Sequence, residues 1–200
     1  MDVLEAIKTT RAMRRLDPER PVTDGQLKIL IDAATRGPAG GGNERARFIV
    51  IRAPQVKQRL GEIYRRAAEV ALAHYEEAAR TDEQAARMLK SAWHLADHLG
   101  ESPALVLVTA RGRRGTVEAS VYPGVQNLML AARALGLGTT LTTIHQQYEE
   151  EVKQLLGIPE QELTFCLVPV GYPLGRWAEA RRKPVTEVAY WDRWGNPPPG

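Results

Sequence analysis

The chain has 200 residues, of which 44% are hydrophobic and 26% are charged, as in an ordinary globular domain. Its 27 Lys and Arg against 24 Asp and Glu leave a formal net charge of +3, too small to imply nucleic-acid binding by itself. No apolar run approaches the roughly 20 residues that span a bilayer, and the N-terminus lacks the apolar region of a secretory signal. We therefore expect a cytoplasmic protein that does not bind membranes or nucleic acid.

The first half of the chain carries helix-capping residues and one apolar run rich in β-branched residues. Asp2 and Thr23 are favoured N-cap types, and Gln26 completes a capping box with Thr23. The run RFIVIR is typical of a strand, and Pro54 suits the first position of a helix. We expect, in order, a helix over 2–9, a helix from Thr23 to Gly37, a strand over 47–52, and two helices over 54–99 that are broken near 80–82.

The second half begins with a buried strand and contains the most regular helical pattern in the chain. The helix over 117–135 is apolar on nearly all sides, which is typical of a core or interface helix. We expect strands over 104–110, 139–144 and 164–172, a helix over 149–156, and a C-terminal arm over 173–200. The aromatic residues of this arm would pack either on a second subunit or back on the same chain.

Four short buried strands separated by helices predict one sheet with helices on both faces. We find no internal repeat and no linker that would separate two domains. The expected organisation is therefore a single domain over 1–200, with a helical excursion at about 54–99 and the arm at about 173–200.

Familiar catalytic motifs are missing from the sequence. There is no G-x-S-x-G, no Gly-Lys-Ser/Thr phosphate loop, and no dinucleotide glycine pattern after a strand. His94 and His98 stand four residues apart but lack a third ligand, so we interpret them as solvated or core-edge histidines. His145 could line a pocket or cap a loop, and Cys166 is expected to be a buried apolar residue.

What remains are features that suit an anionic, planar ligand. Arg11 and Arg14 are three residues apart and could converge on one phosphate, or they could form a solvated basic surface. Arg181 and Arg182 have the same two interpretations. The stretch from Gly40 to Asn43 offers backbone N–H groups and an amide that suit the polar edge of a heterocycle, but it also suits an ordinary loop.

The order of six motifs along the chain resembles the nitroreductase family of flavin enzymes. The motifs are TRAMRRL before PV (10–22), GPAGGGN before RFIV (37–50), QNL to ALGLGT (126–139), LGIP (156–159), VPVGYP (168–173) and RKPV (182–185). The resemblance implies a three-layer α/β/α fold of the α+β class with a central mixed sheet. It also implies a homodimer with an FMN in each of two clefts at the interface and the arm on the partner subunit.

The resemblance also assigns roles to individual residues. It places the FMN phosphate on the Arg11-Ala12-Met13-Arg14 element, with Arg182 joining from the arm and Arg181 as the alternative. Asn43 would bind the isoalloxazine edge, and Gln126 would approach from the partner side of the cleft. Residues Leu141, Thr142 and Thr143 would lie along the ring, with a backbone donor near N5.

This sequence departs from the family pattern in three places. Ala12 and Ala39 stand where the family often has serine. Glu44-Arg45-Ala46 replaces a common Gln-Pro-Trp. A gapless register would put Gly42 at the asparagine position, and a one-residue deletion in the loop would restore Asn43. The missing Trp would widen the pocket.

The implied activity is hydride transfer from NADH or NADPH through flavin N5 to a nitroaromatic, quinone or other conjugated acceptor, in a ping-pong sequence. No side-chain acid or base is obligatory in this scheme. The excursion over 64–99, with Tyr75 and Trp93, would either cover the acceptor site or pack on the flank of the domain. The nicotinamide preference and a deazaflavin donor stay open.

Two other functions are compatible with the sequence. A protein of the same fold could bind or sequester FMN without turnover. A basic nucleic-acid-binding protein would use Arg111, Arg113, Arg114 and the C-terminal tail, although the small net charge argues against it.

Overall fold

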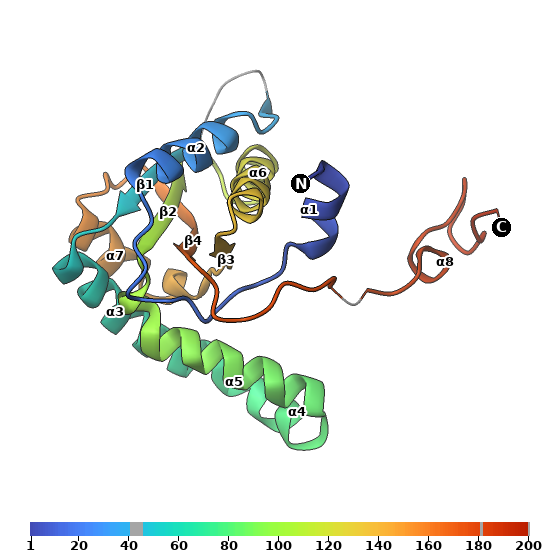
Figure 1. The fold of residues 1–200 in the computed structure, drawn as a ribbon, viewed down its shortest axis with the longest axis horizontal. Coiled ribbons are helices and arrows are strands. Elements are labelled where there is room, and N and C mark those ends of the chain that lie inside the picture. Colours follow the sequence, from blue (N-terminus) through green and yellow to red (C-terminus); the bar gives the residue numbers. More distant parts are fainter. Residues whose placement is uncertain (41–45, 181, 200) are drawn as a thin grey trace.

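The computed structural model describes residues 1–40, 46–180 and 182–199. Its centre is a sheet with strand order β1-β2-β4-β3, covered by helices on both faces (Figure 1). The strands are β1 (Ala46–Ile51), β2 (Ala104–Ala110), β3 (Gly138–Thr139) and β4 (Leu163–Gly171). Neighbouring strands pair antiparallel, and the parallel component is a bridge between Ala12 and Thr139. The expected three-layer α+β fold is confirmed.

The central strand β2 is buried along its whole length and contributes to two hydrophobic cores. Its side chains alternate between the faces, because successive residues of a strand point to opposite sides. Val106 and Val108 face the helices α2 (Asp24–Thr35) and α6 (Glu118–Ala134). Leu105 and Leu107 face α3 (Pro54–Leu72), α5 (Glu83–His98) and α7 (Glu149–Leu156).

The predicted helix starts are borne out by capping contacts. Asp2 caps α1 (Val3–Thr9), with its carboxylate accepting from the backbone N–H of Leu4 at 2.7 Å. Thr23 and Gln26 form the reciprocal capping box at the start of α2. Pro54 occupies the first turn of α3, where its missing N–H costs no helix hydrogen bond.

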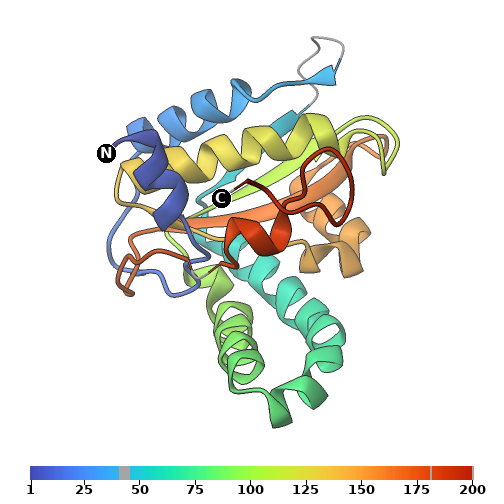
Figure 2. The ribbon, with the colours of Figure 1, turned by 90° about the vertical axis from the view of Figure 1, so that its right-hand side faces the viewer.

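The helical excursion forms a two-helix hairpin that projects from the sheet (Figure 2). The expected break is confirmed at Asp82, which caps α5 with its side chain on the N–H of Gln84. The first helix also ends earlier than expected, at Leu72, and is followed by the 3₁₀ turn η2 (Ala73–Tyr75) and α4 (Glu76–Thr81). The half of the hairpin nearest the sheet is packed into the core through fully buried residues such as Leu60 and Leu99.

The strand predicted over 139–144 is wrong for most of its length. β3 ends at Thr139, and the 3₁₀ helix η4 (Ile144–Tyr148) follows a stretch that has only one bridge, from Thr142 to Leu167. Thr-rich sequence favours a strand locally, but the register of β3 and of the Thr142–Leu167 bridge places Thr140 opposite Pro169, which has no N–H to donate to a ladder. The other predicted strands differ from the observed ones by at most one residue at each end.

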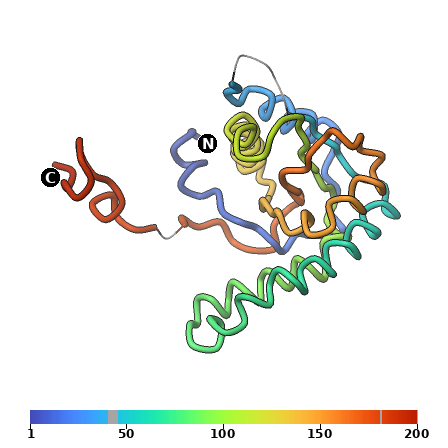
Figure 3. The backbone as a smooth tube through the Cα atoms, turned by 180° about the vertical axis from the view of Figure 1, so that it is seen from behind, coloured from blue at the N-terminus to red at the C-terminus, as the bar shows by residue number. Residues whose placement is uncertain are grey.

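The two ends of the chain run side by side before the arm leaves the domain. The N–H of Asp17 donates to the carbonyl of Tyr172 at 2.8 Å, and the N–H of Ala180 donates to the carbonyl of Lys8 at 3.2 Å. Beyond this contact the arm, with α8 (Val185–Val188), extends away from the sheet (Figures 1 and 3). Its Trp194 is 88% exposed.

Two glycines allow α2 and α6 to approach closely beside the first turns of α6. A Cβ atom on Gly124 would lie 2.5 Å from the carbonyl oxygen of Ala34, and one on Gly37 would lie 2.4 Å from the backbone nitrogen of Gly124. We expect Gly124→Ala to lower the free energy of unfolding by about 1–3 kcal/mol, as overpacking does. Urea unfolding checks this, with Gly175→Ala as control because no atom lies within 4 Å of that position. Equal stability of the two variants would contradict the packing argument.

Candidate functional site

A cavity of about 380 Å³ lies between the helical hairpin and the loop that connects β3 to α7. The hairpin contributes a largely apolar wall from α3, η2 and α5, comprising Tyr64, Ala71, Leu72, Tyr75, Met88, Ala92 and Leu95. The opposite, more polar wall is formed by residues 140–144, 146 and 147. These residues belong to the stretch 140–147, which we call the cavity loop. Apolar walls with a few polar groups are typical of cofactor and small-molecule sites.

Arg14 is the cationic side chain of this cavity, and the adjoining backbone fixes its position. The N–H of Met13 donates to the carbonyl of Thr139 at 2.8 Å, and Ala12 forms the parallel bridge to the same residue. Met13 is buried by this pairing. The segment is thus fastened to the end of β3, and Arg14 follows immediately as a lining residue of the cavity.

The guanidinium of Arg14 is unusual because it is half-buried without a counter-ion. Burial lowers the pKa of Arg14, and the phenol of Tyr64 opposes this only in part. Among the residues that the structure describes, no carboxylate forms an ion pair with it. Removing a cation from water without a partner costs free energy. An anionic ligand in the cavity would offset that cost.

The cavity loop is tied to β4 and to the hairpin through Thr142. Its N–H donates to the carbonyl of Leu167 at 3.0 Å, and it accepts from the N–H of Leu167 at 2.8 Å. Its hydroxyl oxygen lies 2.8 Å from that of Tyr64, whose pKa is raised mainly by burial, so the phenol is neutral. The backbone N–H of Thr142 is therefore already used. By contrast, the N–H groups of Leu141 and Thr143 donate to no acceptor in the described part of the chain.

The other predicted site residues are distributed around this cavity. Arg11 is exposed just beyond α1, and Arg182 is exposed in the arm, whose start the Ala180–Lys8 hydrogen bond holds against the end of α1. Gln126 is exposed on α6 and does not line the cavity. Asn43 and Arg181 lie outside the described residues. Within one chain, the structure brings Arg14 together with Leu141, Thr142 and Thr143.

Residues 7–172 match the sequence model of the nitroreductase family. The chain belongs to the nitroreductase family. It is 26% identical over 205 residues to the NADH dehydrogenase of Thermus thermophilus, and the matched region covers 96% of each of the two chains. It is also 25% identical over 181 residues to iodotyrosine deiodinase 1 of Rattus norvegicus, covering 84% of this chain and 61% of the relative.

Solved structures share the fold of this nitroreductase-family oxidoreductase. One is an iodotyrosine deiodinase bound to FMN and 3-iodo-L-tyrosine, with a TM-score of 0.79 and 22% identity, covering 96% of this chain and 100% of that one. Another is a BluB-like flavoprotein from Clostridium difficile 630, with a TM-score of 0.77 and 18% identity, covering the same shares of the two chains. Relatives with these different names indicate that the family scaffold serves more than one reaction.

The histidines and the cysteine of this nitroreductase-family chain lie outside the cavity walls. His145 is fully buried, with Nε2 3.1 Å from the hydroxyl of Thr164, and burial lowers its pKa to about 4. His94 and His98 stack with ring centroids 4.4 Å apart, and no group of three metal-binding side chains occurs in the described ranges. Cys166 is fully buried, which confirms it as a core residue, and this burial raises the pKa of its thiol to about 12.

Sequence reasoning missed two polar residues of the site, Tyr64 and Gln146. Tyr64 stands in the apolar stripe of α3 and reads as a core aromatic, and Gln146 lies in a region expected to be a strand end or loop. The two aromatic residues expected to cover the acceptor site have different positions. Tyr75 lines the cavity, whereas Trp93 packs beneath the guanidinium of Arg65, at 4.7 Å from the ring centroid. The hairpin thus both packs on the sheet and lines the cavity.

The basic loop proposed for nucleic-acid binding is partly neutralised. Arg111 pairs with Glu162 at 2.7 Å, and Arg114 pairs with Glu149 at 2.6 Å. Arginines held by carboxylates are less available to phosphates, which argues against this alternative. No helix in the part of the chain that the structure describes is long and apolar enough to cross a bilayer.

Proposed function

We propose that this protein is an FMN-dependent NAD(P)H oxidoreductase that reduces a nitroaromatic, quinone or other conjugated acceptor in a ping-pong sequence. Family membership supports an oxidoreductase, and the observation that carries the cofactor assignment is Arg14, a half-buried cation without a counter-ion in the cavity. FMN, when bound, supplies the hydride chemistry at N5. The chain supplies binding, orientation and exclusion of water.

The residues present fit such a cofactor. Arg14, with Arg11 and with Arg182 from the arm, would hold its anionic end through charge-assisted hydrogen bonds. Thr143 or Leu141 would donate a backbone N–H at the N5 edge, since the N–H of Thr142 is already used. The Leu141 side chain, 37% exposed at the cavity, would lie along the ring.

The cavity walls also indicate which acceptors would enter. The hairpin side offers small or flexible apolar residues, such as Ala71, Met88 and Ala92, that suit a flat conjugated ring. No Asp or Glu is among the lining residues that the structure describes, whereas Arg14 is. Because Arg14 would be engaged by the anionic end of FMN, we expect neutral acceptors to be favoured over cationic ones.

We further propose a homodimer in which the arm packs on the partner subunit. A single chain leaves apolar side chains exposed on α1 and on the arm, and a large exposed apolar surface marks an interaction site. These residues are Val3, Leu4, Ile7, Val185, Val188, Tyr190, Trp191 and Trp194. The base of the arm is held to its own chain by Trp177, which stacks on Arg133 at 4.2 Å. The exposed Gln126 would then reach the cleft of the partner.

Removing residues 185–200 is expected to convert the dimer to a monomer and to weaken FMN binding. The truncation deletes the exposed aromatic residues of the arm but leaves the paired segments 8–17 and 172–180 intact. Light scattering coupled to gel filtration measures the mass. A truncated protein that keeps twice the chain mass would contradict the proposed role of the arm.

The function is tested by an absorbance spectrum followed by turnover. We expect flavin bands after addition of FMN, and oxidation of NADH or NADPH that depends on a nitroaromatic or quinone. Absence of FMN binding would remove the enzyme assignment. Bound FMN without turnover, across both nicotinamides and several acceptors, would instead favour the sequestering protein of the same fold.

A further inference from the structure

The edge of β4 next to the cavity loop is interrupted by a β-bulge. Val108 pairs with Cys166, but the next residue, Thr109, pairs with Thr164, so Phe165 is the extra residue on β4. β3 reaches β4 only at its far end, opposite Val170 and Gly171. A bulge turns backbone groups out of the regular ladder. The carbonyls of Thr164 and Phe165 and the N–H of Thr164 therefore need partners other than a strand.

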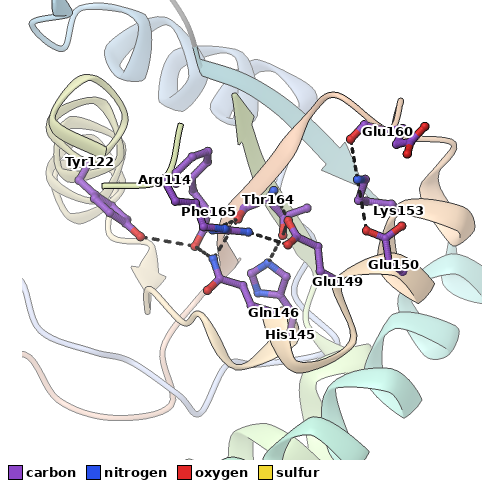
Figure 4. Close-up of polar contacts among 10 residues, drawn as sticks. All are labelled: Arg114, Tyr122, His145, Gln146, Glu149, Glu150, Lys153, Glu160, Thr164 and Phe165. Atoms are coloured by element: carbon purple, nitrogen blue, oxygen red, sulfur yellow. Dashed lines mark hydrogen bonds and ion pairs between the residues drawn. The ribbon is translucent and has the colours of Figure 1, made fainter. Parts of the chain in front are cut away.

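Side chains of the cavity loop and of the residues that follow it take the place of the missing strand, with Gln146 in the loop and Glu149 at the start of α7 (Figure 4). The Gln146 amide donates to the carbonyls of Thr164 and Phe165, at 2.9 and 3.0 Å. The Glu149 carboxylate accepts from the N–H of Thr164 at 2.6 Å. With the backbone pair between Thr142 and Leu167, these contacts fasten the loop along β4.

The hydrogens in this network have one consistent assignment. A carboxylate only accepts, so the hydroxyl of Thr164 donates to Glu149, at 2.8 Å. That hydroxyl must then accept from the Nε2–H of His145, which lies 3.1 Å away. Burial keeps His145 neutral at neutral pH, in agreement with this tautomer.

Arg114 completes the network from the loop between β2 and α6. Its guanidinium donates to Glu149 Oε2 at 2.6 Å and to the carbonyl of Thr164 at 3.2 Å. Both contacts of Arg114 thus act on residues that fix the cavity loop. Arg111 on the same loop forms a similar ion pair, but with Glu162, which touches Thr109 on β2 rather than the cavity loop.

We propose that Glu149 and Arg114 are positioning residues that hold the cavity loop, and with it the free N–H groups of Leu141 and Thr143, in the orientation presented to the flavin. This inference rests on the proposed function. It adds a second set of residues, behind the cavity walls, that governs how the cofactor edge is recognised. Neither residue lines the cavity, so both act through the loop.

The test compares the affinities of Arg114→Gln and Arg111→Gln for oxidised and reduced FMN. A donor at N5 favours the oxidised ring, whose N5 accepts a hydrogen bond, over the reduced ring, whose N5 carries hydrogen. We expect Arg114→Gln to weaken binding of oxidised FMN about tenfold, in line with the loss of a charge-assisted contact, and to weaken binding of reduced FMN less. The ratio of the two dissociation constants should change about fivefold. Arg111→Gln should leave both constants within about twofold of wild type.

The outcomes separate this inference from the proposed function. Equal weakening of both redox forms in Arg114→Gln, or no difference from Arg111→Gln, would overturn the positioning role. Failure of the wild-type protein to bind FMN would instead overturn the proposed function. If Arg114→Gln does not fold, Glu149→Gln replaces it: its amide oxygen keeps the acceptor for Thr164, while its NH2 group takes the place of Oε2 and no longer accepts from Arg114. The same change of ratio is expected. Arg114→Lys, which keeps the charge, should recover part of that ratio.

Discussion

Replacing Arg14 by methionine is expected to weaken FMN binding by about 10- to 100-fold without lowering the stability of the apoprotein. FMN binding and apoprotein stability respond differently because Arg14 has a partner only when the cofactor is bound. In the apoprotein Arg14 is a half-buried cation without a carboxylate partner among the described residues, so its burial is a cost. With an anionic cofactor bound, the same guanidinium makes charge-assisted hydrogen bonds.

Calorimetric titration with FMN and urea unfolding of the apoproteins measure both effects. Arg15→Met is the matched control, because Arg15 is the exposed neighbour and contributes a backbone carbonyl, not its side chain, to the contact with Leu174. This control should bind FMN within about twofold of wild type. An Arg14→Met variant that binds FMN normally, or whose apoprotein is clearly less stable than wild type, would show that Arg14 is a structural residue.

Stability is expected to fall between pH 6.5 and about pH 4 because of His145. The folded protein keeps this ring neutral, with a pKa of about 4 against an ordinary value of 6.5. In that window the unfolded chain binds a proton at His145 that the folded chain does not, so the free energy of unfolding decreases as the pH is lowered. The loss from this group is at most about 3 kcal/mol and is complete below the folded pKa. Well above pH 6.5, where His145 is neutral in the unfolded chain as well, it contributes no pH dependence.

The measurement is urea unfolding at several pH values for wild type and His145→Gln. The free energy of unfolding of the wild type minus that of His145→Gln should narrow or change sign as the pH falls, since the variant has no group to protonate at this position. His74→Gln, at an exposed position on η2, should follow the wild-type curve. The nearby charges of Glu149 and Arg114 are present in all three proteins, so their titration cancels in the comparison. A constant difference between wild type and His145→Gln across this range would exclude a buried neutral histidine.

Most of the fold could be predicted because its signals are local. The caps at Asp2 and Thr23 act within one helical turn, and the uniform apolar run of β2 is a direct consequence of burial on both faces. The predicted strand over 139–144 is wrong because the end of a strand depends on its partner, and Pro169 of β4, which stands opposite Thr140, has no N–H to donate. β-propensity contains no information about that partner edge.

The site was predictable only in part for a similar reason. Arg14 stands in a motif of the family pattern and residues 141–143 follow shortly after another, and the structure brings them to one cavity. Tyr64 was missed because a buried tyrosine in a helix has the same pattern whether its hydroxyl meets Thr142 or a core carbonyl. Glu149 and Arg114 are surface charges in the sequence, and their shared partner Thr164 becomes visible only after β4 is paired.

A crystal structure of the protein with FMN tests the central claim most directly. We expect the phosphate to contact Arg14, the ring to lie along residues 141–143, and a backbone N–H of Leu141 or Thr143 to face N5. FMN bound away from the cavity loop, or a cavity that stays free of FMN while Arg14 points to solvent, would contradict the account.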